Sequence, residues 1–133
     1  MAAGVNDEPI DPLLRYPFYV KALDFYDRVL EDTERPIRDK RWQVIVMQLV
    51  RSAGSISANI EEGYGRGTSQ EFAHRLKIAR GEAYESRGWY WRARRFLPAD
   101  LLNTRRQKLG EIIALLSANI KTFERKAQQD RKR

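Results

Sequence analysis

The stretch that decides the fold is SQEFAHRLKIARGEAYESRGWYWRARRF, residues 69–96. Its apolar and small residues recur every three or four positions, which is the spacing of one face of an α-helix. Thr68 precedes the stretch and Glu71 follows three residues later, a pattern typical of a capped helix N-terminus. We therefore predict a long helix whose buried seam comprises Phe72, Leu76, Ala79, Ala83, Ser86, Tyr90, Ala93 and Leu97.

The rest of the chain predicts three further helices and no strand. Residues 17–33, 42–62 and 98–127 each carry an apolar stripe at helical spacing, and short turns separate them. Four amphipathic helices joined by short turns predict an all-α, antiparallel up-down four-helix bundle. Residues 1–16 are expected to be a flexible N-terminal lead-in, residues 17–127 the bundle, and residues 128–133 a basic C-terminal tail.

Composition excludes several classes of function. The chain has 133 residues, no cysteine and one histidine, so disulfides, thiolate zinc sites and cysteine nucleophiles are excluded. The single His74 leaves a bundle-type di-iron site without its second Glu-x-x-His pair. We therefore expect no metal, no cofactor and no enzymatic activity. With neither a signal peptide nor an apolar run long enough to span a membrane, we expect a cytoplasmic protein.

Charge is unevenly distributed along the chain, whose net charge is +7. Residues 1–34 hold eight acidic and three basic side chains, whereas residues 35–133 hold ten acidic and twenty-two basic ones. This sorting indicates a basic surface that faces a polyanion such as RNA or DNA, or contact between acidic and basic parts of neighbouring subunits.

One side of the helix over residues 69–96, beside the seam, alternates arginines with aromatic rings. Guanidinium groups pair with phosphates while aromatic faces stack on bases, so this pattern favours nucleic-acid binding. The alternative is a solvated basic face whose aromatic side chains partly cover a neighbouring helix. The predicted binding residues are Arg80, Tyr84, Arg87, Trp91, Arg94 and Arg95.

Three further arginines are candidate outlying contacts. Arg105 and Arg106 lie early in the last helix, where cations are disfavoured, so an anionic partner is expected there. Arg66 precedes the start of the helix over residues 69–96, where free backbone N–H groups attract phosphate.

Another side of the same helix carries large apolar residues that the seam does not use. A monomeric bundle should not present such residues to water, so this side predicts self-association, with the small residues of the second helix as a counterpart. Repeated heterologous contacts would close a ring. The predicted interface comprises Ile78, Glu82, Glu85, Trp89 and Phe96.

The stretch RSAGSISANIEEGYGR, residues 51–66, resembles the signature of the bacterial four-helix-bundle family encoded in 23S rRNA intervening sequences. The likeness continues through residues 71–85 and spans roughly residues 18–123. Two positions depart from the family pattern, Glu61 in place of alanine and Glu82 in place of serine, and we expect these carboxylates to pair with Arg51 or with a neighbouring subunit. The residues of the family motif are Asn59, Glu62, Gly63, Tyr64, Gly65 and Arg66.

The resemblance implies an antiparallel four-helix bundle, commonly a homopentamer, with no known catalytic activity. The family is related to the accessory variability determinant of diversity-generating retroelements, and for that branch the resemblance implies binding to nucleic acid and to a reverse transcriptase. Structural roles for the motif are equally open, since Asn59 lies on the helix seam and the glycines shape a turn.

Two hypotheses of function follow. The first is a non-catalytic, oligomeric adaptor that binds RNA or DNA and presents it to a partner enzyme such as a reverse transcriptase. The second is a structural protein–protein interaction module of the same family with no nucleic-acid role. The first predicts association that weakens steeply with salt, and the second predicts salt-tolerant association.

Overall fold

Four long helices make up most of the described chain. The computed structural model describes residues 11–132, which contain the α-helices α1 (Pro17–Thr33), α2 (Lys40–Gly65), α3 (Ser69–Arg92) and α4 (Ala99–Arg131) and no β-strand. Two short 3-10 helices, η2 (Pro12–Arg15) and η3 (Ala93–Arg95), precede α1 and follow α3. None of the helices in this range is long and apolar enough to cross a membrane.

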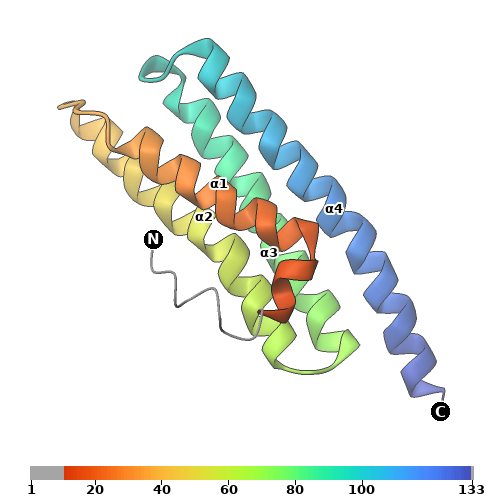
Figure 1. Ribbon diagram of the computed structural model, residues 1–133. Coiled ribbons are helices and arrows are strands. Elements are labelled where there is room, and N and C mark those ends of the chain that lie inside the picture. The colour runs from red at the N-terminus through yellow and green to blue at the C-terminus, as the bar shows by residue number, and fades with distance from the viewer. Residues whose placement is uncertain (1–10, 133) are drawn as a thin grey trace.

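The helices run alternately up and down (Figure 1). α3 packs against α2 on one side and against α4 on the other, while α1 contacts α2 and α4. α1 and α3 therefore lie diagonally across the bundle, and α3 has a helix on each flank. The predicted four-helix, all-α fold is confirmed over the described residues.

The predicted seam of α3 is the centre of the core. All eight of its positions are buried. Small residues bring α2 close to it, as shown by the hydroxyls of Ser52 and Ser86, whose oxygens lie 2.7 Å apart in the interior. The Thr68 side chain accepts a hydrogen bond from the backbone N–H of Glu71 at 3.1 Å, which confirms the predicted helix cap.

The segments expected to flank the bundle differ from the prediction. Within the expected lead-in, η2 is ordered: Leu13 is buried, and the ring of Tyr16 stacks on that of Phe18 at 5.0 Å between centroids. Proline at the first position of η2 suits a helical start, because that N–H needs no partner. In the expected tail, α4 continues to Arg131. Residues 1–10 and 133 lie outside the described residues.

Gly63 sits where α2 and α3 approach most closely near their shared turn. A Cβ atom at this position would lie 2.6 Å from Cβ of Arg75 and 3.1 Å from Cδ1 of Phe72. Either the two helices would have to separate or the aromatic ring would have to move, and both responses disturb the packing of the core.

We expect Gly63→Ala to lower the free energy of unfolding by about 1–3 kcal/mol, because the added methyl overpacks this contact. Urea denaturation followed by circular dichroism measures the change. Gly65→Ala is the matched control, since a Cβ there meets nothing within 4 Å. Its expected effect is neutral or stabilising by up to about 1 kcal/mol. Equal destabilisation by both variants would contradict the assigned role of Gly63.

Candidate nucleic-acid interface

The predicted binding residues of α3 lie on its flank toward α4. Two of them are aromatic residues that are about half exposed, Tyr84 at 50% and Trp91 at 52%. Burial of these rings within the subunit would have removed the case for a binding surface. Arg94 and Arg95, which both lie in η3, are exposed as well, while Arg87 is half-buried.

The guanidinium groups lie against these rings. Cζ of Arg87 is 4.9 Å from the centroid of the Tyr84 ring, and Cζ of Arg94 is 4.5 Å from that of Trp91. From α4, Arg106 also reaches Trp91, with its Cζ 5.6 Å from the same centroid. Cation–π contacts of this kind hold planar cations beside the rings at the surface. We call this group, together with Arg80, Asn103 and Gln107, the α3–α4 surface.

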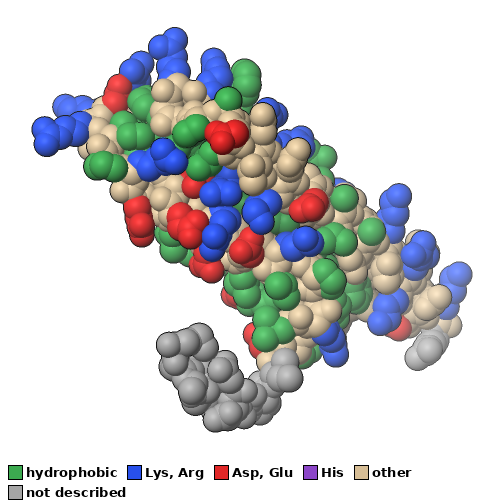
Figure 2. Space-filling view, turned by 45° about the horizontal axis from the view of Figure 1, so that its top comes forward, with side chains coloured by type: hydrophobic (Ala, Val, Ile, Leu, Met, Phe, Trp, Pro, Cys, Tyr) green, Lys and Arg blue, Asp and Glu red, His purple; other side chains and the backbone are tan. Residues whose placement is uncertain are grey.

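The arginines of the α3–α4 surface are not neutralised within the subunit. Among residues 11–132, no carboxylate oxygen lies within 4.0 Å of Arg80, Arg87, Arg94 or Arg106. Arg80 donates instead to Oγ of Ser117 at 3.1 Å, which ties α3 to α4. Lys and Arg side chains project from the upper end of the bundle in Figure 2, where Figure 1 places the α3–α4 turn. The positive charge here is therefore available to an external anion.

Two α4 residues of this surface are absent from the sequence-based prediction. Asn103 and Gln107 line a shallow depression of about 320 Å³ together with Arg87 and Arg106. The available signal was the spacing of residues 103, 106 and 107 on the flank of the α4 stripe. The spacing alone does not show that these residues lie beside α3; the contact between Arg106 and Trp91 does.

Arg105, predicted as a nucleic-acid contact, is not part of the α3–α4 surface. Its Nε and Nη2 donate to the carboxylate of Asp32 in α1 at 2.7 and 3.0 Å. The hydroxyl of Tyr90 donates to the same carboxylate at 2.6 Å, and the Asp32 side chain is only 3% exposed. Burial, followed by the neighbouring Asp32, raises the pKa of Tyr90, and the hydrogen bond to Asp32 raises the pKa of Arg105. The expected anionic partner of Arg105 exists, but it lies inside the bundle.

Arg66 is not part of the α3–α4 surface either. It caps the end of α2 and donates from Nη2 to Oε1 of Glu62 at 2.8 Å. That hydrogen bond lowers the pKa of Glu62 and raises the pKa of Arg66. Ser69, at the same end of the bundle, is about 33 Å along α3 from Trp91, given a rise of 1.5 Å per residue.

The other residues of the family motif have structural roles. Asn59 donates to the carbonyl of Ser55 at 2.8 Å and accepts from Nη1 of Arg75 at 3.3 Å, which links α2 to α3. Tyr64 is half-buried, with its ring edge-on to Phe72. Gly65 is exposed at the end of α2. The tight turn itself is made by Gly67, whose φ of +81° favours glycine.

The side of α3 predicted to mediate self-association is not turned to water. Trp89 and Phe96 are half-buried against the core, and Phe96 packs on Trp42 of α2 at 5.7 Å between centroids. Ile78 is half-buried as well. These large apolar residues are therefore less exposed than the prediction assumed, and Phe96 packs on α2 within the subunit. The oligomeric state itself stays a prediction.

The carboxylates on this side of α3 are paired within the subunit. Arg51 of α2 bonds to Glu85 and lies 3.5 Å from Oε1 of Glu82, as expected for a family departure at Glu82. Burial, with a contribution from Glu85, raises the pKa of Glu82. The other departure, Glu61, accepts a hydrogen bond from the hydroxyl of Tyr19 at 2.8 Å.

Comparison with known proteins agrees with this architecture. The family model described as 23S rRNA-intervening sequence protein matches residues 16–118. Among solved structures, the chain is similar to the crystal structure of a protein of unknown function from the S23 ribosomal protein family of Bacteroides thetaiotaomicron. The two are 27% identical, with a TM-score of 0.72, over 78% of this chain and 95% of that one. No curated protein matches the chain. Because the family model covers most of its length, this chain belongs to the 23S rRNA-intervening sequence protein family.

Proposed function

We propose that this protein is a non-catalytic adaptor that binds nucleic acid, RNA or DNA, through the α3–α4 surface. The arginines contact phosphates, and Tyr84 and Trp91 stack on bases. The single observation that carries the proposal is the set of guanidinium groups beside two half-exposed rings, with no carboxylate within reach among the described residues. An arginine whose only role were solubility would not need an aromatic neighbour.

The unpaired charge of the α3–α4 surface supports a binding role. Some exposed arginines of the described chain, such as Arg41 and Arg66, pair with nearby carboxylates, whereas Arg87, Arg94 and Arg106 have no such partner and lie close together across two helices. Such pairing lowers the local potential, whereas unpaired cations on neighbouring helices add to one another and attract polyanions. The α3–α4 surface keeps this potential at the end of the bundle where its rings are exposed.

Affinity measured against salt concentration tests the proposal. Fluorescence anisotropy with labelled oligonucleotides should show log affinity falling linearly with log salt, with a slope of about −0.7 for each phosphate contacted on a single strand. Absence of binding at low salt would remove the proposal. It would leave the structural protein–protein interaction module as the remaining hypothesis, for which salt-tolerant association with a protein is expected.

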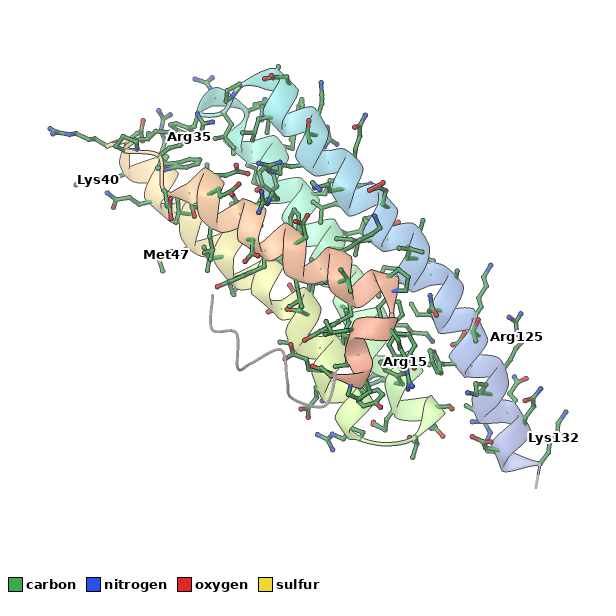
Figure 3. The ribbon with its side chains drawn as sticks, viewed as in Figure 1. Arg15, Arg35, Lys40, Met47, Arg125 and Lys132 are labelled. Carbon is green, nitrogen blue, oxygen red and sulfur yellow. The ribbon has the colours of Figure 1, made fainter. Side chains whose placement is uncertain are left out.

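The proposal includes assembly of several subunits and delivery of the nucleic acid to a partner. Val44 and Met47 are large apolar residues exposed on the outer side of α2, at 56% and 72%, and Met47 points away from the bundle in Figure 3. They support a homo-oligomer, for which the family resemblance implies a pentameric ring. The same resemblance motivates a reverse transcriptase as the partner enzyme. Light scattering gives the subunit number, and a monomeric mass would exclude the ring.

A further inference from the structure

The depression between α3 and α4 is lined by two arginines that each contact one of the exposed rings. Arg87 lines it from α3 and contacts the Tyr84 ring, while Arg106 lines it from α4 and contacts the Trp91 ring. A ligand seated in this depression therefore meets a cation from each helix, and each of these cations lies beside an exposed aromatic residue.

The remaining walls of the depression are amides rather than charges. Asn103 and Gln107 are exposed on α4. A phosphate offers only acceptors, so a surface that binds the backbone alone needs only donors. A side-chain amide carries two N–H donors and a carbonyl acceptor, which matches the mixed donors and acceptors on the edge of a nucleobase.

The two rings lie about two helical turns apart. Tyr84 and Trp91 are seven residues apart on α3, about 10.5 Å along the axis. Because guanidinium groups lie over both rings, a base that stacks on either ring uses the face left open or takes the place of an arginine that turns to a phosphate. In a duplex the faces of the bases are stacked on other bases and their Watson–Crick edges are paired, so the two rings would find no free base face.

We propose that the α3–α4 surface binds a single strand with unpaired bases, and that Asn103 and Gln107 read the edge of a base held in the depression. This inference rests on the proposed function and specifies its ligand. Tyr84 and Trp91 give affinity without regard to sequence, because every base has a flat face. The two amides add a preference among bases, because their donors and acceptors suit some edges better than others.

Anisotropy titrations with short RNA homopolymers and with a duplex of equal charge test the inference. Single strands should bind about tenfold more tightly than the duplex, since stacking is available only to them. Affinities among the homopolymers should span about fivefold or more. In the variant Asn103→Ala/Gln107→Ala, the affinities for the homopolymers should differ by only about twofold. The slope of log affinity against log salt should stay unchanged, because the variant removes no charge.

The matched control is Gln43→Ala/Gln129→Ala, which removes two exposed amides from other parts of α2 and α4 and should leave the span unchanged. Equal binding of duplex and single strand would overturn the inference while leaving the proposed function in place. The same holds if the Asn103→Ala/Gln107→Ala variant keeps the full span. Failure of every oligonucleotide to bind at low salt would instead overturn the proposed function, and the inference with it.

Discussion

Asp32→Ala should lower the free energy of unfolding by about 3–5 kcal/mol, because it strips a buried arginine of its counter-charge. The Asp32 carboxylate accepts from both Arg105 and Tyr90, and the Arg105 side chain is only 12% exposed. Without the carboxylate, a guanidinium and a phenol are left without their partner in the interior. Urea denaturation at one protein concentration measures the loss as a shift of the midpoint.

Two comparisons isolate the buried pair. Asp24→Ala removes the contact of Asp24 with Lys108, whose side chains are 48% and 36% exposed, and the expected loss is below about 1 kcal/mol. A triple variant with Asp32, Arg105 and Tyr90 replaced by leucine, methionine and phenylalanine should recover much of the stability, since no unpaired charge remains. If Asp32→Ala lowered the free energy of unfolding as little as Asp24→Ala, the ion pair of Asp32 with Arg105 would not be buried in solution.

The variant Arg87→Glu/Arg94→Glu should weaken binding to single-stranded nucleic acid by at least about 25-fold at about 0.1 M salt. The two substitutions remove two phosphate contacts, and the new carboxylates repel the strand. With a slope of about 0.7 for each phosphate contacted, the salt dependence should fall by about 1.4 units. Anisotropy titrations across a salt series give both quantities.

The fold itself should tolerate these substitutions. Arg87 and Arg94 have no carboxylate partner among residues 11–132, so the helical circular dichroism and the unfolding midpoint should stay close to wild type. The matched control is Arg125→Glu/Lys132→Glu, a change of the same charge on one side chain of α4 and on the residue that follows it, at the far end of the bundle in Figure 3. Equal loss of binding in both variants would show that net charge, rather than the α3–α4 surface, drives association.

Periodicity in the sequence predicts the elements of this fold and its main seam. Every predicted seam position from Phe72 to Leu97 is buried, although α3 itself ends at Arg92 and Ala93 lies in η3. The predicted bounds of α1 coincide with the observed Pro17–Thr33. A helical repeat places apolar residues relative to one another within a single helix, so these features need no knowledge of the neighbouring helices.

Contacts between helices are not predictable from that repeat. Arg105 finds its partner in Asp32, 73 residues earlier, because of the rotation and register of α1 against α4. Trp89 lies away from the α3 seam, but α3 has a helix on each flank, so its buried arc is wider than the seam. Trp91 and Arg87 lie on the same helix, so its repeat predicts that they share a side. Asn103 and Gln107 lie on another helix, and they join this surface only because α4 packs beside α3.

An even number of alternating helices places both ends of the described chain at one pole of the molecule (Figure 1). At that pole Leu13 of η2 and Phe123 of α4 contribute to the core, and neither lies in the family-matched segment 16–118. The opposite pole, with Trp91 and Asp32, lies wholly within that segment. Arg131, the last residue of α4, is about 38 Å along that helix from Arg106, which contacts Trp91, so the C-terminal end of α4 lies far from the exposed rings.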